Sequence, residues 1–244
     1  MRLKKIIKQL EGKFPLELAE EWDNVGLLLD STRREIKSIM LCLDITRDVV
    51  DKAVANKVDL IISHHPFIFS PLKKITTDEV NGEKILKLAR NNIAVYSMHT
   101  NIDSGIGGLN DFIIKKIGQE GKVFVISDNR CVELRKLVTG DLIDAKDKII
   151  NPLRIQKLKS AITIEELCKI IKEKLCIPNV RVVGDTAKLV KSYAICTGSG
   201  MSFSGNVKKK ADVFITGDLK YHESLDASEL NQTIIDLGHY ESEY

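Results

Sequence analysis

The sequence predicts an α/β protein in which a mostly parallel sheet is flanked by helices, with a smaller α/β insert domain. Short apolar runs rich in Ile, Val and Leu alternate with longer segments whose apolar residues recur at helical spacing. The chain has 244 residues, a hydrophobic fraction of 43% and a formal net charge of +3. These values are typical of a folded globular protein and exclude a disordered chain.

The expected elements of the major domain follow one another in a regular order. An amphipathic helix is expected over residues 1–11, which lack the apolar core of a signal peptide. Strands are expected at 39–43, 58–62, 93–98, 212–215 and 233–237. Helices are expected at 47–56, 82–91, 109–117 and 219–230. Because no apolar run approaches ~20 residues, we expect a soluble chain without a membrane span.

The pattern changes between about residues 122 and 185. Short β-like segments at 123–127 and 132–139 precede a loop that contains Asn151 and Pro152. Thr163 stands three residues before Glu166, which forms a capping box and predicts the start of a helix. Strands are expected at 180–183 and 188–195, and no internal repeat is obvious. We therefore predict an insert domain at 127–185 within a major domain formed by 1–126 and 186–244.

Cysteine usage and charge indicate the compartment and exclude some partners. The five cysteines are odd in number, include no C-x-x-C pair and mostly lie in apolar stretches. This usage predicts core thiols in a reducing cytosol, and hence a cytoplasmic protein. The 37 basic residues are nearly balanced by 34 acidic ones, so neither a nucleic-acid partner nor a membrane partner is expected.

Four of the five histidines directly follow expected strands. His64 and His65 come after 58–62, His99 comes after 93–98, and His239 comes after 233–237. In an open α/β sheet, ligands bind outside the carboxyl ends of the strands. A single histidine at such a point more often closes a loop. Four of them favour a metal or catalytic site at one edge of one sheet.

The spacing of these residues favours a dinuclear centre. Neighbouring side chains in an extended chain diverge, so His64 and His65 suit two adjacent ions better than one. Asp103 is the expected carboxylate after the third strand. His239 and Glu243 share one face of an expected helix, and a carboxylate such as Glu243 can bridge two ions. These ligand types leave Zn, Fe and Mn open, and Asp23 is either a site residue or a turn residue.

Five motifs together cover both ends of the chain. They are residues 21–27 (EWDNVGL), 61–66 (IISHHP), 99–103 (HTNID) with 108–110 (GLN), 216–222 (TGDLKYH) and 238–240 (GHY). They resemble motifs of the dinuclear-metal-centre family of type-two GTP cyclohydrolase I homologues. The resemblance implies two divalent ions per chain, a toroidal homohexamer with the metal pairs facing an inner cavity, and ligands at His64, His65, Asp103, His239 and Glu243, the last one bridging.

The resemblance also implies an activity. A metal-dependent hydrolase of this kind would open the imidazole ring of the guanine base of GTP and release formate. His99 and His222 are the candidates for a proton shuttle, since an ordinary histidine titrates near ~6.5. Alternatively, His99 orients Asp103 and His222 caps its helix. The alternative function is a metal-binding regulatory or metal-handling interaction protein without turnover, because a fold does not fix a function.

Overall fold

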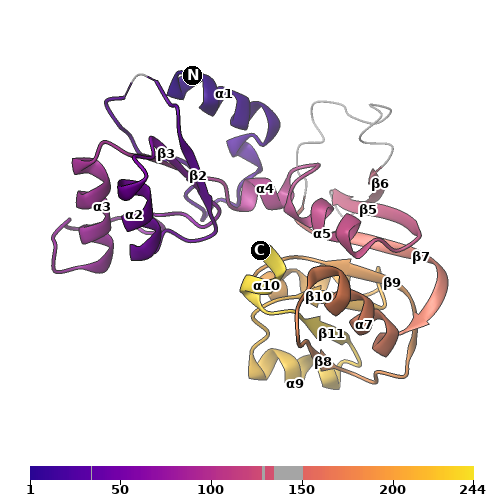
Figure 1. The fold of residues 1–244 in the computed structure, drawn as a ribbon. Helices are drawn as coiled ribbons and strands as arrows, with labels where there is room; N and C mark the ends of the chain where they lie inside the picture. Colours follow the sequence, from indigo (N-terminus) through magenta and orange to yellow (C-terminus); the bar gives the residue numbers. More distant parts are fainter. Residues whose placement is uncertain (34, 128–129, 135–150) are drawn as a thin grey trace. The chain divides into compact units, whose positions relative to one another are not determined.

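Two compact units make up the chain. The computed structural model describes residues 1–33, 35–127, 130–134 and 151–244. The units are Met1–Ile102 and Asp103–Tyr244, and each has its own sheet (Figure 1). Both sheets contain parallel and antiparallel pairs flanked by helices. The predicted α/β class is confirmed.

The first unit is a four-stranded sheet with helices on both faces. Its elements are α1 (Leu3–Lys13), η1 (Leu16–Leu18), β1 (Gly26–Leu29), β2 (Ile39–Cys42), α2 (Arg47–Ala55), β3 (Leu60–Ser63), α3 (Val80–Arg90) and β4 (Ala94–Ser97). The strand order is β1-β4-β3-β2, in which β2, β3 and β4 are parallel and β1 is antiparallel to β4. The helix α4 (Thr100–Ser104) follows β4 and contains the division between the units.

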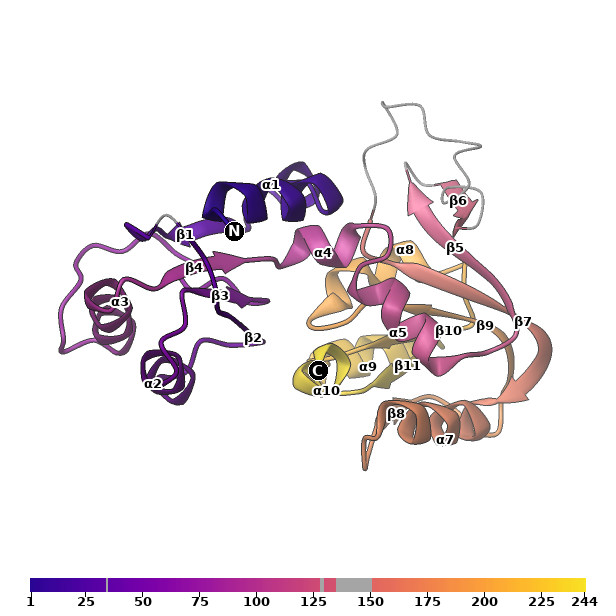
Figure 2. The same cartoon turned by 45° about the horizontal axis from the view of Figure 1, so that its top comes forward.

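Alternating side chains of β3 and β4 bury both faces of this sheet. Leu60 and Tyr96 pack in the cluster that contains α1, whereas Ile61 and Val95 pack in the cluster that contains α2 and α3. Figure 2 shows α1 on one side of the strands and α2 and α3 on the other. The sheet is thus covered on both faces, and its carboxyl edge is where β2, β3 and β4 lead into the loops.

The second unit is built on a seven-stranded sheet. Its elements are α5 (Leu109–Ile117), β5 (Gly121–Ser127), β6 (Arg130–Glu133), β7 (Arg154–Thr163), α7 (Ile164–Leu175), β8 (Arg181–Val183), β9 (Leu189–Ile195), η2 (Gly200–Phe203), α8 (Ser204–Val207), β10 (Val213–Thr216), α9 (Tyr221–Glu229), β11 (Thr233–Asp236) and α10 (His239–Glu243). The strand order is β6-β5-β7-β9-β10-β11-β8, and only β9, β10 and β11 are mutually parallel. Tyr193 and Ile215 pack with α5 and α7, whereas Ala194 and Phe214 pack with α8 and α9.

The units repeat one order of elements. In the first, α1 and β1 precede β2, β3 and β4, and β1 pairs with the last of these strands. In the second, α7 and β8 precede β9, β10 and β11, and β8 again pairs with the last. Both edge strands are antiparallel to their neighbours. The sequence showed no obvious repeat, but the structure contains one arrangement twice.

The observed boundaries differ from the expected domains 1–126 with 186–244 and 127–185. β7 pairs antiparallel with both β5 and β9, so residues on either side of position 186 share one sheet. The change of pattern near residue 122 marks the start of the antiparallel strands of the second unit, because β5 pairs antiparallel with β6 and β7.

The expectation that the histidine-bearing strands share one sheet is wrong. β3 and β4 lie in the four-stranded sheet, and β11 lies in the seven-stranded sheet. Buried parallel strands look alike along a sequence, so apolar periodicity cannot assign a strand to a sheet.

Most individual elements agree with their predictions. The nine major-domain elements expected after the first helix are all present, and their ends lie within two residues of the expected positions. The capping box is confirmed, because Thr163 Oγ1 accepts from the Glu166 N–H at 3.1 Å and Glu166 Oε2 accepts from the Thr163 N–H at 2.8 Å. β1 and β7 were not predicted. Part of the expected strand 132–139 lies outside the described residues.

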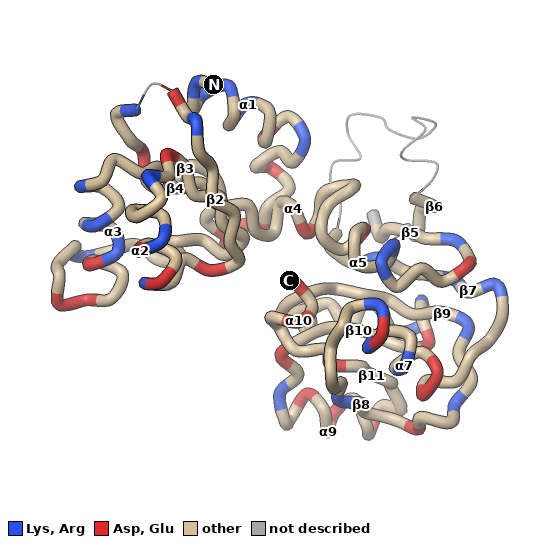
Figure 3. Tube along the Cα trace, viewed as in Figure 1, with Lys and Arg blue, Asp and Glu red and all other residues tan. Residues whose placement is uncertain are grey.

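The burial of the cysteines and the distribution of charge can be compared with the expectations from the sequence. Cys168 and Cys196 are buried, but Cys131 and Cys176 are exposed, so the core-thiol interpretation fails for those two. Figure 3 shows Lys and Arg positions interleaved with Asp and Glu along both units. Among the described residues, every helix is too short or too polar to cross a membrane.

Candidate metal centre

The carboxyl edge of the first sheet carries three histidines. β3 and β4 are parallel and pair Ser63 with Ser97, so both strands end at the same level. The two serine hydroxyl oxygens lie 2.8 Å apart. His64 and His65 directly follow Ser63, and His99 follows Ser97 after one residue. The register therefore places these three rings at one edge, as the strand-end argument predicted for this part of the chain.

The three rings form a compact cluster that fits a metal ion. One ring nitrogen from each of His64, His65 and His99 lies within 4.8 Å of the others. The ring centroids are 5.0 to 5.5 Å apart. Imidazole nitrogens are preferred ligands of zinc, iron and related divalent ions. This cluster could therefore hold a divalent transition metal.

Each ring of the cluster is oriented by an oxygen acceptor at Nδ1. The pairs are His64 with the Met98 carbonyl at 2.9 Å, His65 with the Asp44 carboxylate at 2.8 Å, and His99 with the Asp23 carboxylate at 2.9 Å. Because each acceptor requires a proton on Nδ1, the lone pair of each neutral ring lies on Nε2. Metal-binding histidines show this arrangement, in which a second group fixes the ring and its tautomer.

Asp23 is a site residue rather than only a turn residue. Its Oδ2 accepts from the Thr100 N–H at 3.0 Å as well as from the Thr100 hydroxyl, while Oδ1 accepts from His99. Burial alone would raise the pKa of Asp23, but the bonds from His99 and Thr100 lower that pKa below its usual value. Asp23 therefore keeps its charge and holds both the His99 ring and the start of α4.

The second unit places two predicted ligands one helical turn apart. His239 begins α10 directly after the loop from β11, and its Nε2 lies 3.2 Å from Glu243 Oε2. Its Nδ1 lies 2.6 Å from Asp218 Oδ2, which follows β10. Hydrogen bonding to Glu243 and then to Asp218 outweighs burial and raises the pKa of His239 to about 9. The i, i+4 spacing predicted this shared helix face.

A glycine leaves room for these two side chains. Gly198 follows β9 with φ +63°, and a Cβ at this position would overlap Glu243 Oε1 and lie 3.5 Å from His239 Nε2. Its N–H donates to Ser242 Oγ at 2.9 Å. A side chain larger than hydrogen would therefore displace Glu243, which explains the need for glycine here.

Asp103 lies at the start of the second unit, in α4, and is buried. Its carbonyl accepts from Asn110 Nδ2 at 3.2 Å, and Asn110 Oδ1 accepts from the Thr197 N–H at 2.9 Å. The next loop is fixed by Arg154, a fully buried side chain whose Nη2 donates to the carbonyls of Ser104 and Gly105, each at 3.0 Å. Arg154 also pairs with Asp111.

Within each unit, the structure brings predicted ligands together. His64 and His65 lie with His99 in the first unit, and His239 lies with Glu243 in the second. His222 lies on exposed α9 against Tyr221, and Lys220 rather than His222 is the N-cap of that helix. Sequence reasoning missed the orienting roles of Asp44 and Asp218, although they stand one and three residues beyond predicted strands.

Comparison with known proteins decides the family. Residues 1–244 match the model of the family described as Duf34/NIF3 (NGG1p interacting factor 3). The chain belongs to this family. It is 36% identical to a Clostridium acetobutylicum protein named GTP cyclohydrolase 1 type 2 homolog, over 100% of this chain and 86% of that protein. It is 34% identical to NIF3-like protein 1 of Drosophila melanogaster, over 99% of this chain and 78% of that protein. The resemblance seen in the sequence is confirmed.

Two solved structures have the same fold as this chain. The Staphylococcus aureus hypothetical protein SA1388 aligns with a TM-score of 0.81 at 30% identity, over 99% of this chain and 87% of that one. Reduced HcgD from Methanocaldococcus jannaschii aligns with a TM-score of 0.78 at 30% identity, over 100% of this chain and 89% of that one. These alignments include both units, so the arrangement of elements is shared along the whole chain.

Proposed function

We propose that this protein is a dinuclear metal-dependent hydrolase that resembles GTP cyclohydrolase 1 type 2 and opens the imidazole ring of the guanine base of GTP. The observation that carries the proposal is the cluster of His64, His65 and His99, in which an oxygen acceptor orients every ring. The names of relatives such as the 36% identical clostridial protein supply the substrate.

The proposed ligand set is the one that the resemblance implies: His64, His65, Asp103, His239 and Glu243. Two divalent ions held by these residues would lower the pKa of a bound water and polarise the carbon that it attacks. The imidazole and carboxylate donors fit zinc, iron or manganese. The proposal includes the toroidal homohexamer, which a mass measurement in solution would test.

The protein residues contribute orientation and proton transfer. The Met98 carbonyl and the Asp44 carboxylate fix the rings of His64 and His65, so their Nε2 atoms need no reorganisation to bind an ion. Within the cluster, His64 and His65 are the proposed ligands, and His99, held by Asp23, is the proposed proton carrier at Nε2. One water adds at C8 and opens the ring, and a second releases formate. His99 takes a proton from the attacking water and gives it to the departing nitrogen.

A comparison of two histidine variants tests the proposal. His64→Ala removes a ring of the cluster, whereas His222→Ala removes an exposed ring on α9 and serves as the matched control. We expect wild type and His222→Ala to bind two ions per chain and to release formate from GTP. We expect His64→Ala to lose bound metal and to reduce formate release by about 100-fold or more. Metal content is measured by mass spectrometry of the purified chains.

Wild-type protein that releases no formate with Zn, Mn or Fe would contradict the hydrolase proposal. The second candidate is a metal-binding protein that acts through a protein partner. It is favoured by the name of a yeast relative, NGG1-interacting factor 3, which is 27% identical over 99% of this chain and 86% of that protein. Two bound ions without turnover would support this candidate.

A further inference from the structure

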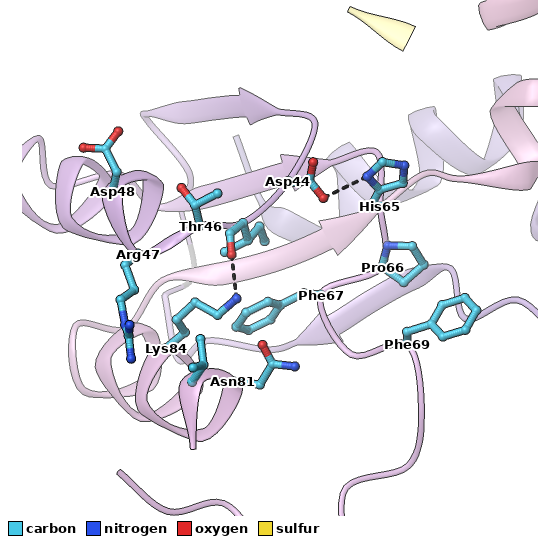
Figure 4. A pocket seen from close by; sticks show the side chains of 12 residues that line it. Asp44, Thr46, Arg47, Asp48, His65, Pro66, Phe67, Phe69, Asn81 and Lys84 are labelled. Atoms are coloured by element: carbon cyan, nitrogen blue, oxygen red, sulfur yellow. Dashed lines mark hydrogen bonds and ion pairs between the residues drawn. The ribbon is translucent and has the colours of Figure 1, made fainter. Parts of the chain in front are cut away.

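A cavity of about 670 Å³ lies next to His65 within the first unit. Its walls come from the connection between β2 and α2, from residues 65–69 after β3, and from the first turns of α3. Figure 4 shows Lys84 and Asn81 on the α3 side and His65, with its partner Asp44, across the cavity. Its volume is within the range of pockets that hold small organic ligands.

Lys84 is the basic side chain of this cavity that lacks a carboxylate partner. Its Nζ donates to the Ile45 carbonyl at 2.7 Å and lies 5.5 Å from the centre of the Phe67 ring. Within the described part of the chain, no ion pair involves Lys84. Arg47, which also lines the cavity, is paired with Glu83 at 2.9 Å. Lys87, one turn further along α3, is paired with Asp51 at 2.5 Å.

The charge environment of Lys84 favours an anion. Burial, followed by the nearby Arg47 guanidinium, lowers the pKa of Lys84, and Asp44 opposes this change. Both of the lowering effects act against the charged ammonium group. A negative group beside Nζ would offset both of them, and the ammonium has further N–H donors besides the one used by Ile45.

Aromatic side chains extend from the cavity toward the histidine cluster. Phe69 lines the cavity and is 54% exposed. Its ring centre lies 6.0 Å from that of Trp22, which in turn lies 6.0 Å from that of His99. Exposed aromatic faces of this kind stack on planar bases, with a gain of roughly 1–3 kcal/mol per base.

We propose that this cavity is the substrate pocket of the metal centre, where Lys84 binds a phosphate group of a purine nucleotide and Phe69 stacks against its base. This inference rests on the proposed function, because it assigns a pocket to the same substrate. Lys84 binds the phosphate and takes no part in the bond changes at the guanine ring.

Binding of GTP to Lys84→Gln tests the inference, with Lys87→Gln as the matched control on the same helix. Calorimetric titrations use metal-loaded and metal-free protein, with GTP, guanosine and tripolyphosphate as probes. We expect Lys84→Gln to weaken GTP and tripolyphosphate binding roughly 10- to 100-fold, which is the effect of losing a hydrogen bond to a charged group. Guanosine binding should stay unchanged, and Lys87→Gln should behave as wild type.

Two further measurements keep the test decisive if Lys84→Gln does not fold. Lys84→Arg keeps the positive charge and should bind GTP within a fewfold of wild type. In unmodified protein, GTP should protect Lys84 from acylation more than it protects Lys87, as measured by peptide mass spectrometry. Equal protection of the two lysines, or equal GTP affinity of the two Gln variants, would overturn the role of Lys84.

The outcomes separate this inference from the proposed function. If GTP binds in a Lys84-dependent way but no formate appears, the pocket stands and the hydrolase proposal fails. If formate appears while Lys84→Gln keeps the wild-type KM, the hydrolase stands and the pocket fails. A GTP affinity that Phe69→Ala leaves unchanged would overturn the stacking role of Phe69.

Discussion

The two units place their candidate ligands at equivalent points of the same arrangement. His99 follows β4, the last strand of the first unit, and Asp103 comes four residues later, at the first position of the second unit. In the second unit, His239 follows β11 and Glu243 comes four residues later. β4 and β11 are both the last of three parallel strands, and each pairs with an antiparallel edge strand. After the last parallel strand of each sheet, the chain therefore carries a histidine followed four residues later by a carboxylate.

The units differ in what surrounds those ligands. The first carries Asp44, His64 and His65 in the loops after β2 and β3, and the rings fill its carboxyl edge. The second carries Gly198 and Gly217 at the corresponding points, where the Gly217 N–H donates to the Gly198 carbonyl at 2.8 Å. The missing side chain at Gly198 leaves space for Glu243. The shared topology determines at which strand ends the candidate ligands lie. The loop residues determine how many histidine rings lie at that edge of each sheet.

The largest expected effect is a loss of stability that is confined to the second unit. Arg154→Leu removes the fully buried guanidinium that pairs with Asp111 and donates to the carbonyls of the loop after α4, so we expect a loss of about 3–5 kcal/mol of stability. Urea unfolding followed by circular dichroism should show an early transition. The fluorescence of Trp22, the sole tryptophan, should report a smaller shift for the first unit.

Lys159→Met is the control for this variant, because Lys159 lies on the same strand and makes an exposed pair with Glu120. Its stability should stay within about 0.5 kcal/mol of wild type. Identical shifts of the two probes in Arg154→Leu would show that the units unfold as one body.

The next effect compares the carboxylates that orient the histidines. Asp44→Asn and Asp218→Asn should each weaken metal binding roughly 10- to 100-fold, because each loosens one ring at Nδ1. Titration against a chelating dye measures the affinity, and Asp48→Asn, an exposed partner of Lys52, is the control. If only one of the two variants binds metal more weakly, the two units share their topology but not the role of the orienting carboxylate.

Asp218→Asn has a second expected consequence in metal-free protein. Losing this negative charge should lower the pKa of His239 from its value of about 9. Proton NMR of the imidazole would follow the titration. A pKa that stays near 9 would show that Glu243 alone sets it.

The smallest expected effect concerns an aspartate that occupies the same position in both units, before β3 in the first and before β10 in the second. Asp59 Oδ2 accepts from the N–H groups of Lys37 and Ser38, and Asp212 accepts in the same way from Lys191 and Ser192. Asp59 is buried and Asp212 is exposed. We therefore expect Asp59→Asn to cost about 1 kcal/mol at pH 7 and Asp212→Asn to cost less.

The cost of Asp59→Asn should depend on pH with a defined sign. Burial acts to raise the pKa of Asp59, but the N–H groups of Lys37 and Ser38 and the Arg33 guanidinium lower it. A carboxyl whose pKa is lowered on folding stabilises the protein above its unfolded value and loses that contribution as the pH falls through the folded value. The difference in urea midpoint between wild type and Asp59→Asn should therefore be smaller at pH 3 than at pH 7. An equal difference in midpoint at the two pH values would show that the Asp59 charge does not contribute to stability.

Sequence patterns predicted the elements that have strong local signals. The parallel strands were found because uninterrupted apolar runs mark them, and the helix after Thr163 was found through its capping box. β7 was missed because Lys157 and Lys159 interrupt its apolar pattern beyond Pro152. The hydrogen bond between Asp23 and His99 spans 76 positions, and only the folded chain brings these residues together.

The repeat escaped notice for a related reason. Lys37-Ser38 with Asp59 correspond to Lys191-Ser192 with Asp212, whereas His99 and His239 follow the last parallel strands by two and three residues. The connection between β3 and β4 is longer than that between β10 and β11, so the separation between equivalent residues is not constant along the chain. A fixed period is the usual sequence sign of a repeat. Only the shared strand order reveals the correspondence.

The contacts of Arg154 also bear on the order in which the protein matures during synthesis. Arg154 is 50 positions beyond Ser104, whose carbonyl it holds, so the loop after α4 is fixed only once the second unit is being made. The three histidines of the first unit, with Asp23, Asp44 and Met98, all lie within the first 102 residues. All residues of this cluster and the groups that orient its rings have therefore been translated before α10.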